Sequence, residues 1–217
     1  MSKVSILLKN IFTGVGEGPH WDEATDNLYM VDIHGSPTEK TGGILRYNCE
    51  TGRLDKKNMG LPSSVIPALN GSVIFTAGQN ICKYDNWDSE NYTVLHSVES
   101  GQKTRFNDAK CDPNGRLVGG TMGLVKENPL TLFETKTSGL YGLNGTTNEL
   151  KKLDGGLSLN NGLSWSKDGK TFFLVDSLYK EIYVYDYDIE TFTCSNKKVL
   201  LDFKKESYFP DGMTIDN

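Results

Sequence analysis

Residues 28–32 read Leu28-Tyr29-Met30-Val31-Asp32 and follow Trp21 by seven positions. The same arrangement returns at residues 172–176, which read Phe172-Phe173-Leu174-Val175-Asp176 and follow Trp165 by seven positions. Two looser copies begin with an Asn-Gly pair, at Asn70-Gly71 before residues 73–76 and at Asn114-Gly115 before residues 117–120. Each copy is typical of a polar turn that leads into a short apolar strand. The repetition indicates an all-β protein.

A second apolar segment follows in every copy, at residues 44–47, 81–84, 140–143 and 182–185. These segments alternate apolar and mixed positions with period 2, as half-buried strands do. The copies are spaced by about 45, 44 and 55 residues, which is the range of a four-stranded propeller blade. A sandwich of unrelated hairpins is the alternative, and the spacing favours the propeller. Residues 124–134 do not predict a helix, because Pro129 interrupts them.

The length predicts an incomplete propeller. A ring of six blades at about 45 residues each needs about 270 residues, and the chain has 217. Four copies are present, and residues 213–217 resemble the turn that opens a fifth. We therefore expect residues 1–217 to form a single β-propeller domain that lacks its C-terminal blades.

Composition narrows the classes of function. The net charge of −5 is mild and spread along the chain, and no basic cluster predicts a nucleic-acid partner. The longest apolar run near the start, residues 4–8, is too short for a signal peptide or a membrane span, which predicts a cytoplasmic protein. Four scattered cysteines and three histidines make a zinc site or a Cys/His nucleophile pair unexpected.

Three distant segments each set one oxygen-bearing side chain against glycine: Glu17 in Gly-Glu-Gly-Pro, Asn161 in Asn-Asn-Gly, and Asp211 in Pro-Asp-Gly. Two carboxylates and an amide suit a hard cation such as Ca²⁺. Taken singly, each is an ordinary turn residue. A propeller could unite them, because the innermost strand of every blade ends at its central channel.

Five motifs in order resemble the family of regucalcin (senescence marker protein 30), gluconolactonases and luciferin-regenerating enzymes, most closely its animal regucalcin-like branch. They are Gly16-Glu17-Gly18-Pro19-His20-Trp21, Arg105-Phe106-Asn107-Asp108 with Asp112-Pro113-Asn114-Gly115-Arg116, Asn161-Gly162-Leu163-Ser164-Trp165-Ser166, Tyr185-Asp186-Tyr187-Asp188 and Pro210-Asp211-Gly212-Met213. The resemblance covers nearly the whole chain. It implies a six-bladed β-propeller, here about four blades and the start of a fifth.

The resemblance also implies a site. Glu17, Asn161 and Asp211 match the family's three ligands for one divalent cation, and Arg105 and Asn107 match its substrate-binding pair. Regucalcin-like members place a glutamate about twenty residues after that arginine. Here Val125 occupies the position and Glu127 is the nearest acid, which leaves the identity of the sugar open.

These residues predict a metal-dependent hydrolase that opens sugar lactones such as gluconolactone. The cation, Ca²⁺ first with Zn²⁺, Mn²⁺ and Mg²⁺ as alternatives, would polarise the lactone carbonyl and acidify water. Asp211 would be the general base as well as a ligand, and Arg105 and Asn107 would hold ring hydroxyls or the developing oxyanion. Asp108 is expected to orient Asn107 or a water, or to cap a turn.

Other interpretations remain open. His20 is not expected to be a ligand, since the set is oxygen-only, and Trp21 and Trp165 are expected in the core. A non-enzymatic calcium-binding or regulatory protein is the second hypothesis for function. The third is an inactive truncated isoform, because an open ring exposes unpaired edges that invite aggregation. A complete ring would be a monomer.

Overall fold

The computed structural model describes residues 5–34, 41–123 and 136–216. These residues contain sixteen strands in four sheets of four strands each, all antiparallel, and the predicted all-β class is confirmed. Within the described residues no helix is long and apolar enough to cross a membrane. Residues 124–134 lie outside the described ranges.

Each sheet is one propeller blade, with its strands in sequence order. Blade 1 holds β1 (Val15–Asp22), β2 (Asn27–Ile33), β3 (Gly42–Asn48) and β4 (Leu54–Met59). Blade 2 holds β5 (Pro62–Pro67), β6 (Val73–Ala77), β7 (Asn80–Tyr84) and β8 (Thr93–Ser97). Blade 3 holds β9 (Thr104–Cys111), β10 (Leu117–Gly123), β11 (Ser138–Asn144) and β12 (Glu149–Leu157). Blade 4 holds β13 (Asn160–Trp165), β14 (Thr171–Asp176), β15 (Glu181–Asp188) and β16 (Thr193–Asp202).

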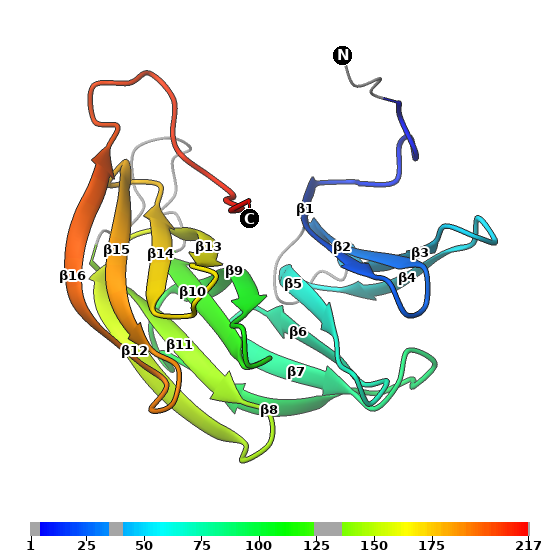
Figure 1. The fold of residues 1–217 in the computed structure, drawn as a ribbon. Helices are drawn as coiled ribbons and strands as arrows, with labels where there is room; N and C mark the ends of the chain where they lie inside the picture. Colours follow the sequence, from blue (N-terminus) through cyan, green and yellow to red (C-terminus); the bar gives the residue numbers. More distant parts are fainter. Residues whose placement is uncertain (1–4, 35–40, 124–135, 217) are drawn as a thin grey trace.

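The four blades follow an open arc around a common centre, with β1, β5, β9 and β13 innermost (Figure 1). The segment after β16 returns to this centre beside β13, where the Gly162 amide donates a 3.3 Å hydrogen bond to the Asp211 carbonyl. An incomplete propeller is what the repeat count predicted. The innermost strands all start at the same end of the channel, so distant turns meet there.

Apolar side chains fill the space between neighbouring blades. One cluster joins blades 1 and 2 and includes Val31, Ile44 and Phe75, and another joins blades 2 and 3 around Ile81 and Phe106. The third joins blades 3 and 4 and is rich in aromatic rings, among them Phe172, Tyr185 and Trp165. Because strand side chains alternate between faces, each blade contributes one face to each neighbour.

Trp165 is buried, as expected, but the prediction that Trp21 is a core residue is wrong: Trp21 is 47% exposed. Trp165 pairs with Phe172 on the face of blade 4 that packs on blade 3. Trp21 pairs with Leu28, whose neighbours Tyr29 and Val31 point into the cluster with blade 2. Trp21 and Leu28 therefore lie on the opposite face of blade 1, which no described sheet covers.

In blades 1 and 4, an aspartate near the end of the second strand holds the residues just before the innermost strand. In blade 1, buried Asp32 accepts hydrogen bonds from the amides of Thr13 (3.0 Å) and Gly14 (2.9 Å) and an ion pair from Lys56 (2.8 Å). Although burial raises the pKa of Asp32, these hydrogen bonds hold it below its usual value. In blade 4, buried Asp176 accepts the amide of Ser158 (2.9 Å) in the same way.

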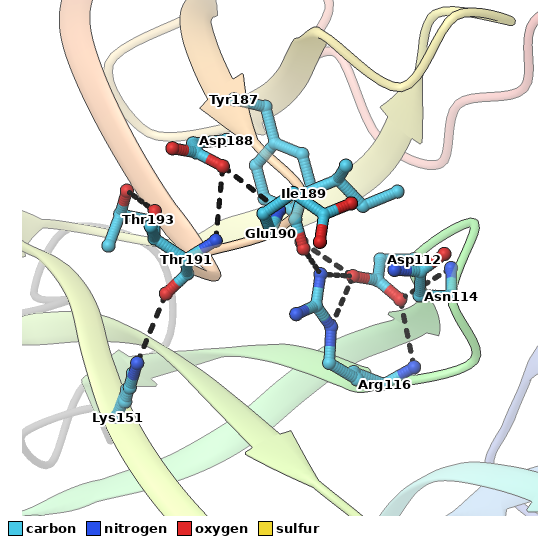
Figure 2. Close-up of polar contacts among 10 residues, drawn as sticks. All are labelled: Asp112, Asn114, Arg116, Lys151, Tyr187, Asp188, Ile189, Glu190, Thr191 and Thr193. Atoms are coloured by element: carbon cyan, nitrogen blue, oxygen red, sulfur yellow. Dashed lines mark hydrogen bonds and ion pairs between the residues drawn. The ribbon is translucent and has the colours of Figure 1, made fainter.

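The turns at the other end of blades 3 and 4 are joined by a buried polar cluster (Figure 2). Arg116 is ion-paired with Asp112 (2.7 Å) and donates to the carbonyl of Ile189 (2.6 Å), while the Tyr187 hydroxyl donates to the same Asp112 carboxylate (2.7 Å). Asp188 caps its own turn by accepting the amides of Glu190 and Thr191. The motifs that contain Asp112 and Asp188 thus meet here, and both aspartates stabilise turns of the fold.

Candidate metal and substrate site

One cavity of about 280 Å³ opens where the innermost strands start, and we call it the mouth cavity. Its lining includes every predicted site residue of the described chain: Glu17, Arg105, Asn107, Asn161 and Asp211. They come from β1, β9, β13 and the segment after β16. The fold therefore brings together residues that lie up to 194 positions apart in the sequence. Val125 and Glu127 fall outside the described residues.

Two bulges direct the predicted ligands into this cavity. The β1–β2 register shifts between Glu17 and His20, and Gly18 has a φ of +56° there. The β13–β14 register shifts between Asn160 and Leu163, around Asn161. A bulge turns a side chain away from the regular alternation of the strand. The glycines beside Glu17 and Asn161 therefore belong to bulges that orient these two side chains, and not only to turns.

Glu17 is a half-buried carboxylate with an elevated pKa. Burial is the main cause, the negative charge of Asp211 adds to it, and the positive charge of Arg105 opposes it. The Asn161 side chain is oriented by its amide nitrogen, which donates to the hydroxyl of Ser177 at 3.1 Å. The amide oxygen, on the other branch, remains the group that can act as a ligand.

Asp211 is exposed and lies outside any strand. Its segment is positioned by the hydrogen bond from Gly162 to its carbonyl and by the absence of a side chain at Gly162. A Cβ on Gly162 would lie 2.5 Å from the Met213 nitrogen and 2.8 Å from the Asp211 oxygen. Asp211, the third predicted ligand, therefore reaches the cavity because residues 211–213 pack directly against Gly162, where a side chain would block them.

Arg105 and Asn107 are both on β9 and face the channel. Burial lowers the pKa of Arg105 to about 10, with the charge of Glu17 opposing that shift, so the guanidinium stays charged at neutral pH. One of its nitrogens donates to the Phe106 carbonyl at 2.7 Å. The Asn107 amide nitrogen donates to the Asn160 carbonyl at 2.9 Å, which ties β9 to β13. Asn107 therefore has a positioning role that the sequence did not reveal.

Asp108 also lines the mouth cavity. Its pKa is raised to about 6, mainly by burial, and the negative charges of Glu17 and Asp211 contribute to that rise. From the sequence it was expected to orient a neighbour or cap a turn. It pairs with Gly120 of β10 in the register of the sheet, and its place in the lining of two neighbouring cavities shows that it lies in the channel. The sequence carried one signal for this, its adjacency to Asn107.

The donor set and the charge of the cavity fit a divalent cation. Three carboxylates and one guanidinium line it, so its formal charge is negative when all are ionised. The pKa values of two of these carboxylates, Glu17 and Asp108, are elevated mainly by burial and to a smaller extent by the neighbouring acids. Among the described residues, no three His, Cys, Asp or Glu side chains converge as a metal site. The candidate set therefore depends on the neutral oxygen of Asn161 as its third member.

His20 does not line the mouth cavity. It lines the next cavity along the channel, of about 340 Å³, together with Lys110. Burial lowers the pKa of His20, which keeps the imidazole neutral at pH 7.

The four cysteines are all free, and Cys49 is exposed while Cys82 is buried.

Comparison with known proteins agrees with this arrangement. The family model described as SMP-30/Gluconolactonase/LRE-like region matches residues 15–217. Regucalcin of Macaca fascicularis is 36% identical over 203 residues, a match that covers 93% of this chain and 64% of the relative. A luciferin-regenerating enzyme structure superposes with a TM-score of 0.80 at 32% identity, covering 93% of this chain and 66% of that one.

A structure titled as a calcium-binding protein, regucalcin, from Agrobacterium tumefaciens has a TM-score of 0.77 at 21% identity. It covers 91% of this chain and 63% of the other, and at that identity it supports the fold alone. The chain thus spans about two thirds of the length of the relatives that it matches.

Proposed function

Because the chain belongs to the SMP-30/gluconolactonase/LRE-like family, we propose that it is a divalent-metal-dependent hydrolase that opens sugar lactones. The observation that supports this most is the lining of the mouth cavity. Three carboxylates, two amides and a guanidinium from four separate segments share about 280 Å³, a size that suits a small polar substrate.

Glu17, Asn161 and Asp211 would hold the cation, with Ca²⁺ as the first candidate and Zn²⁺, Mn²⁺ and Mg²⁺ as alternatives. When bound, such an ion supplies Lewis acidity toward a lactone carbonyl and lowers the pKa of water. The negative charge of the mouth cavity attracts the ion. Asn161 keeps its oxygen available, since the hydrogen bond to Ser177 engages the nitrogen of the same amide.

Asp211 is the proposed general base. Its carboxylate would take a proton from the attacking water, whose oxygen forms the new bond to the carbonyl carbon. The carbon–oxygen bond of the ring then breaks, and the proton passes from Asp211 to the departing ring oxygen. The product is the open-chain hydroxy acid. Asp211 suits this work because it is exposed and lines the cavity, and water can reach it.

Arg105 is proposed to stabilise the negative charge that develops on the carbonyl oxygen or to bind ring hydroxyls. It is charged, half-buried and held by the Phe106 carbonyl. Such a preorganised donor stabilises charge more than a mobile surface arginine does. Asn107 would bind the sugar with its amide oxygen and its second N–H, because the first N–H is engaged by Asn160.

The test measures the rate of glucono-1,5-lactone hydrolysis by the protein in three states: untreated, treated with EDTA, and resupplied with Ca²⁺, Zn²⁺, Mn²⁺ or Mg²⁺ after EDTA is removed. We expect activity to be lost with the chelator and restored by at least one of the four ions. Asp211→Ala should lower kcat by about 100-fold or more, as loss of a general base does. Asp216→Ala, an exposed acid in the same segment, is the matched control. Activity that ignores EDTA, or an Asp211→Ala protein as active as the parent, would contradict the proposal.

A calcium-binding protein without turnover is the second candidate. The observation in its favour is that Asp211, the proposed base, lies on an exposed segment outside any strand. An ion can draw such a carboxylate to itself, whereas catalysis requires a fixed one. Calorimetry with Ca²⁺ and a panel of lactones distinguishes the two: binding without hydrolysis favours this candidate, and failure to bind any divalent ion removes both.

A further inference from the structure

A second cavity, which we call the side cavity, lies beside the mouth cavity between the starts of blades 2 and 3. Its volume is about 480 Å³, within the range of small-molecule sites. It is bordered by the turn between β6 and β7, by Ser100, Gln102 and Lys103 before β9, and by Arg105 at the start of β9. Arg105 also lines the mouth cavity. The two cavities therefore adjoin at one guanidinium-bearing residue.

The charge of the side cavity is opposite to that of the mouth cavity. No acidic residue lines it, and its two charged residues are Lys103 and Arg105. This is unusual in a chain with a net charge of −5. The Lys103 side chain is exposed and forms no ion pair with any residue that the structure describes. Its ammonium group is free to meet an incoming anion.

The polar walls of the side cavity are held in place by hydrogen bonds. The Gln79 amide nitrogen donates to the carbonyls of Glu99 (2.8 Å) and Gln102 (3.0 Å) and so fixes the segment that carries Lys103. Ser97 donates its hydroxyl to the Asn80 amide oxygen at 2.6 Å. Within the part of the chain that the structure describes, the nitrogen of that amide has no hydrogen-bond acceptor, so its two hydrogens are available to a ligand. Fixed neutral donors beside two cations are suited to an anion with several oxygens.

We propose that the side cavity binds an anionic group, a phosphate or a carboxylate, on the exocyclic end of a sugar lactone whose ring occupies the mouth cavity. This inference rests on the proposed function, because it assumes a lactone beside Arg105. It adds the substrate class: a charged sugar lactone is preferred to a neutral one. Lys103 supplies the charge, and Asn80 supplies oriented N–H donors.

The test compares kcat/KM for 6-phosphoglucono-1,5-lactone, glucaro-1,4-lactone and uncharged glucono-1,5-lactone in the parent chain and in Lys103→Gln. We expect the parent to prefer one charged lactone, and which one it prefers separates phosphate from carboxylate recognition. In Lys103→Gln the preference for the charged over the uncharged lactone should fall about fivefold, a change that appears in KM. Lys167→Gln removes the same charge from an exposed turn at the opposite end of the blades and should leave the preference unchanged.

Binding provides an independent readout. Calorimetry with 6-phosphogluconate, glucarate and gluconate, which need no turnover, should show tighter binding of a charged acid than of gluconate, lost in Lys103→Gln and weaker in high salt. If no lactone is hydrolysed but this selectivity remains, the proposed hydrolysis fails and the anion site stands. Equal binding of all three acids, or equal kcat/KM for all three lactones, would overturn the anion site whatever the activity.

Discussion

Gly162 is the residue on which the position of Asp211 depends. A Cβ at this position would meet the Met213 nitrogen at 2.5 Å and the Met213 Cβ at 2.6 Å, and real Cβ atoms do not approach so closely. We predict that Gly162→Ala moves the Asp211 segment away from β13 while the four blades stay folded. Affinity for Ca²⁺ should then fall by about tenfold or more, because one ligand is displaced from the set.

The measurement for Gly162→Ala is calorimetric titration with Ca²⁺, accompanied by thermal unfolding. Gly145→Ala is a matched control, since nothing lies within 4 Å of a Cβ there. The control should bind Ca²⁺ like the parent. Unchanged affinity in Gly162→Ala would mean that the segment does not depend on this close approach, or that Asp211 is not a ligand.

The candidate site residues could be found from the sequence, but their geometry could not. Gly-Glu-Gly-Pro, Asn-Asn-Gly and Pro-Asp-Gly are recognisable as short motifs, and all three open onto one cavity. The bulge at Glu17 and the contact of Asn107 with β13 depend on strand pairing over long sequence separations. Asp108 was underestimated for the same reason, since its place in the cavity depends on residues of all four blades that meet at the centre.

At the scale of single elements, the start of β1 depends on Asp32. This buried carboxylate binds the amides of Thr13 and Gly14 and the ammonium of Lys56. We predict that Asp32→Asn lowers the free energy of unfolding by about 3 kcal/mol at pH 7, because the Lys56 ammonium and the two amides lose the buried charged partner that they share. Denaturation in urea measures the loss, with exposed Asp88→Asn as the control.

The contribution of Asp32 should depend on pH. Its folded-state pKa is below the usual value, so its stabilisation is complete above the unfolded pKa of about 3.9 and is lost as the pH falls below it. The difference in stability between the parent and Asp32→Asn should therefore be constant from about pH 7 to pH 5 and shrink below about pH 4. A difference that grows as the pH falls would contradict this assignment.

The joint between blades 3 and 4 is a second element-scale test. Arg116 is 11% exposed, and its partner Asp112 is fully buried. We predict that Arg116→Ala costs about 3 kcal/mol of unfolding free energy, because it leaves the buried Asp112 carboxylate without its cation and with only neutral donors, the Tyr187 hydroxyl and two backbone amides. Arg53→Ala, which removes an arginine that is 70% exposed from its ion pair with Asp55, should cost less than about 1 kcal/mol. Urea denaturation measures the unfolding free energy of both variants. Equal losses in the two variants would show that the buried ion pair between blades 3 and 4 stabilises the fold no more than an exposed one.

The repeat spacing predicted the strands and the blades because both depend on local alternation and turn chemistry. The segments at 28–32 and 172–176 lie within β2 and β14, as the pattern indicated. The burial of the two tryptophans depends on neighbouring blades, which local pattern does not report. Trp21 and Trp165 occupy corresponding positions, yet one is 47% exposed and the other 7%. A sequence repeat therefore predicts the strands of a blade, but it does not predict which faces of that blade are covered by neighbouring blades.

At the scale of the whole molecule, the question is whether an open arc of four blades behaves as one folded unit. Each blade shares an apolar cluster with its neighbour, and the clusters follow one another without a gap from blade 1 to blade 4. We predict a single cooperative unfolding transition in urea, since no blade can lose its packing without uncovering the next.

Two tryptophans allow that prediction to be tested at both ends of the arc. Trp87 is 8% exposed in the cluster between blades 1 and 2, and Trp165 is 7% exposed in the cluster between blades 3 and 4. In Trp87→Phe the fluorescence of Trp165 should report blades 3 and 4, and in Trp165→Phe that of Trp87 should report blades 1 and 2, while exposed Trp21 changes little in either. For each variant, the urea midpoint measured by fluorescence is compared with the midpoint measured by circular dichroism on the same variant. The two midpoints should coincide. Midpoints that separate in either variant would mean that the blades unfold independently, as an inactive truncated isoform with uncovered edges would.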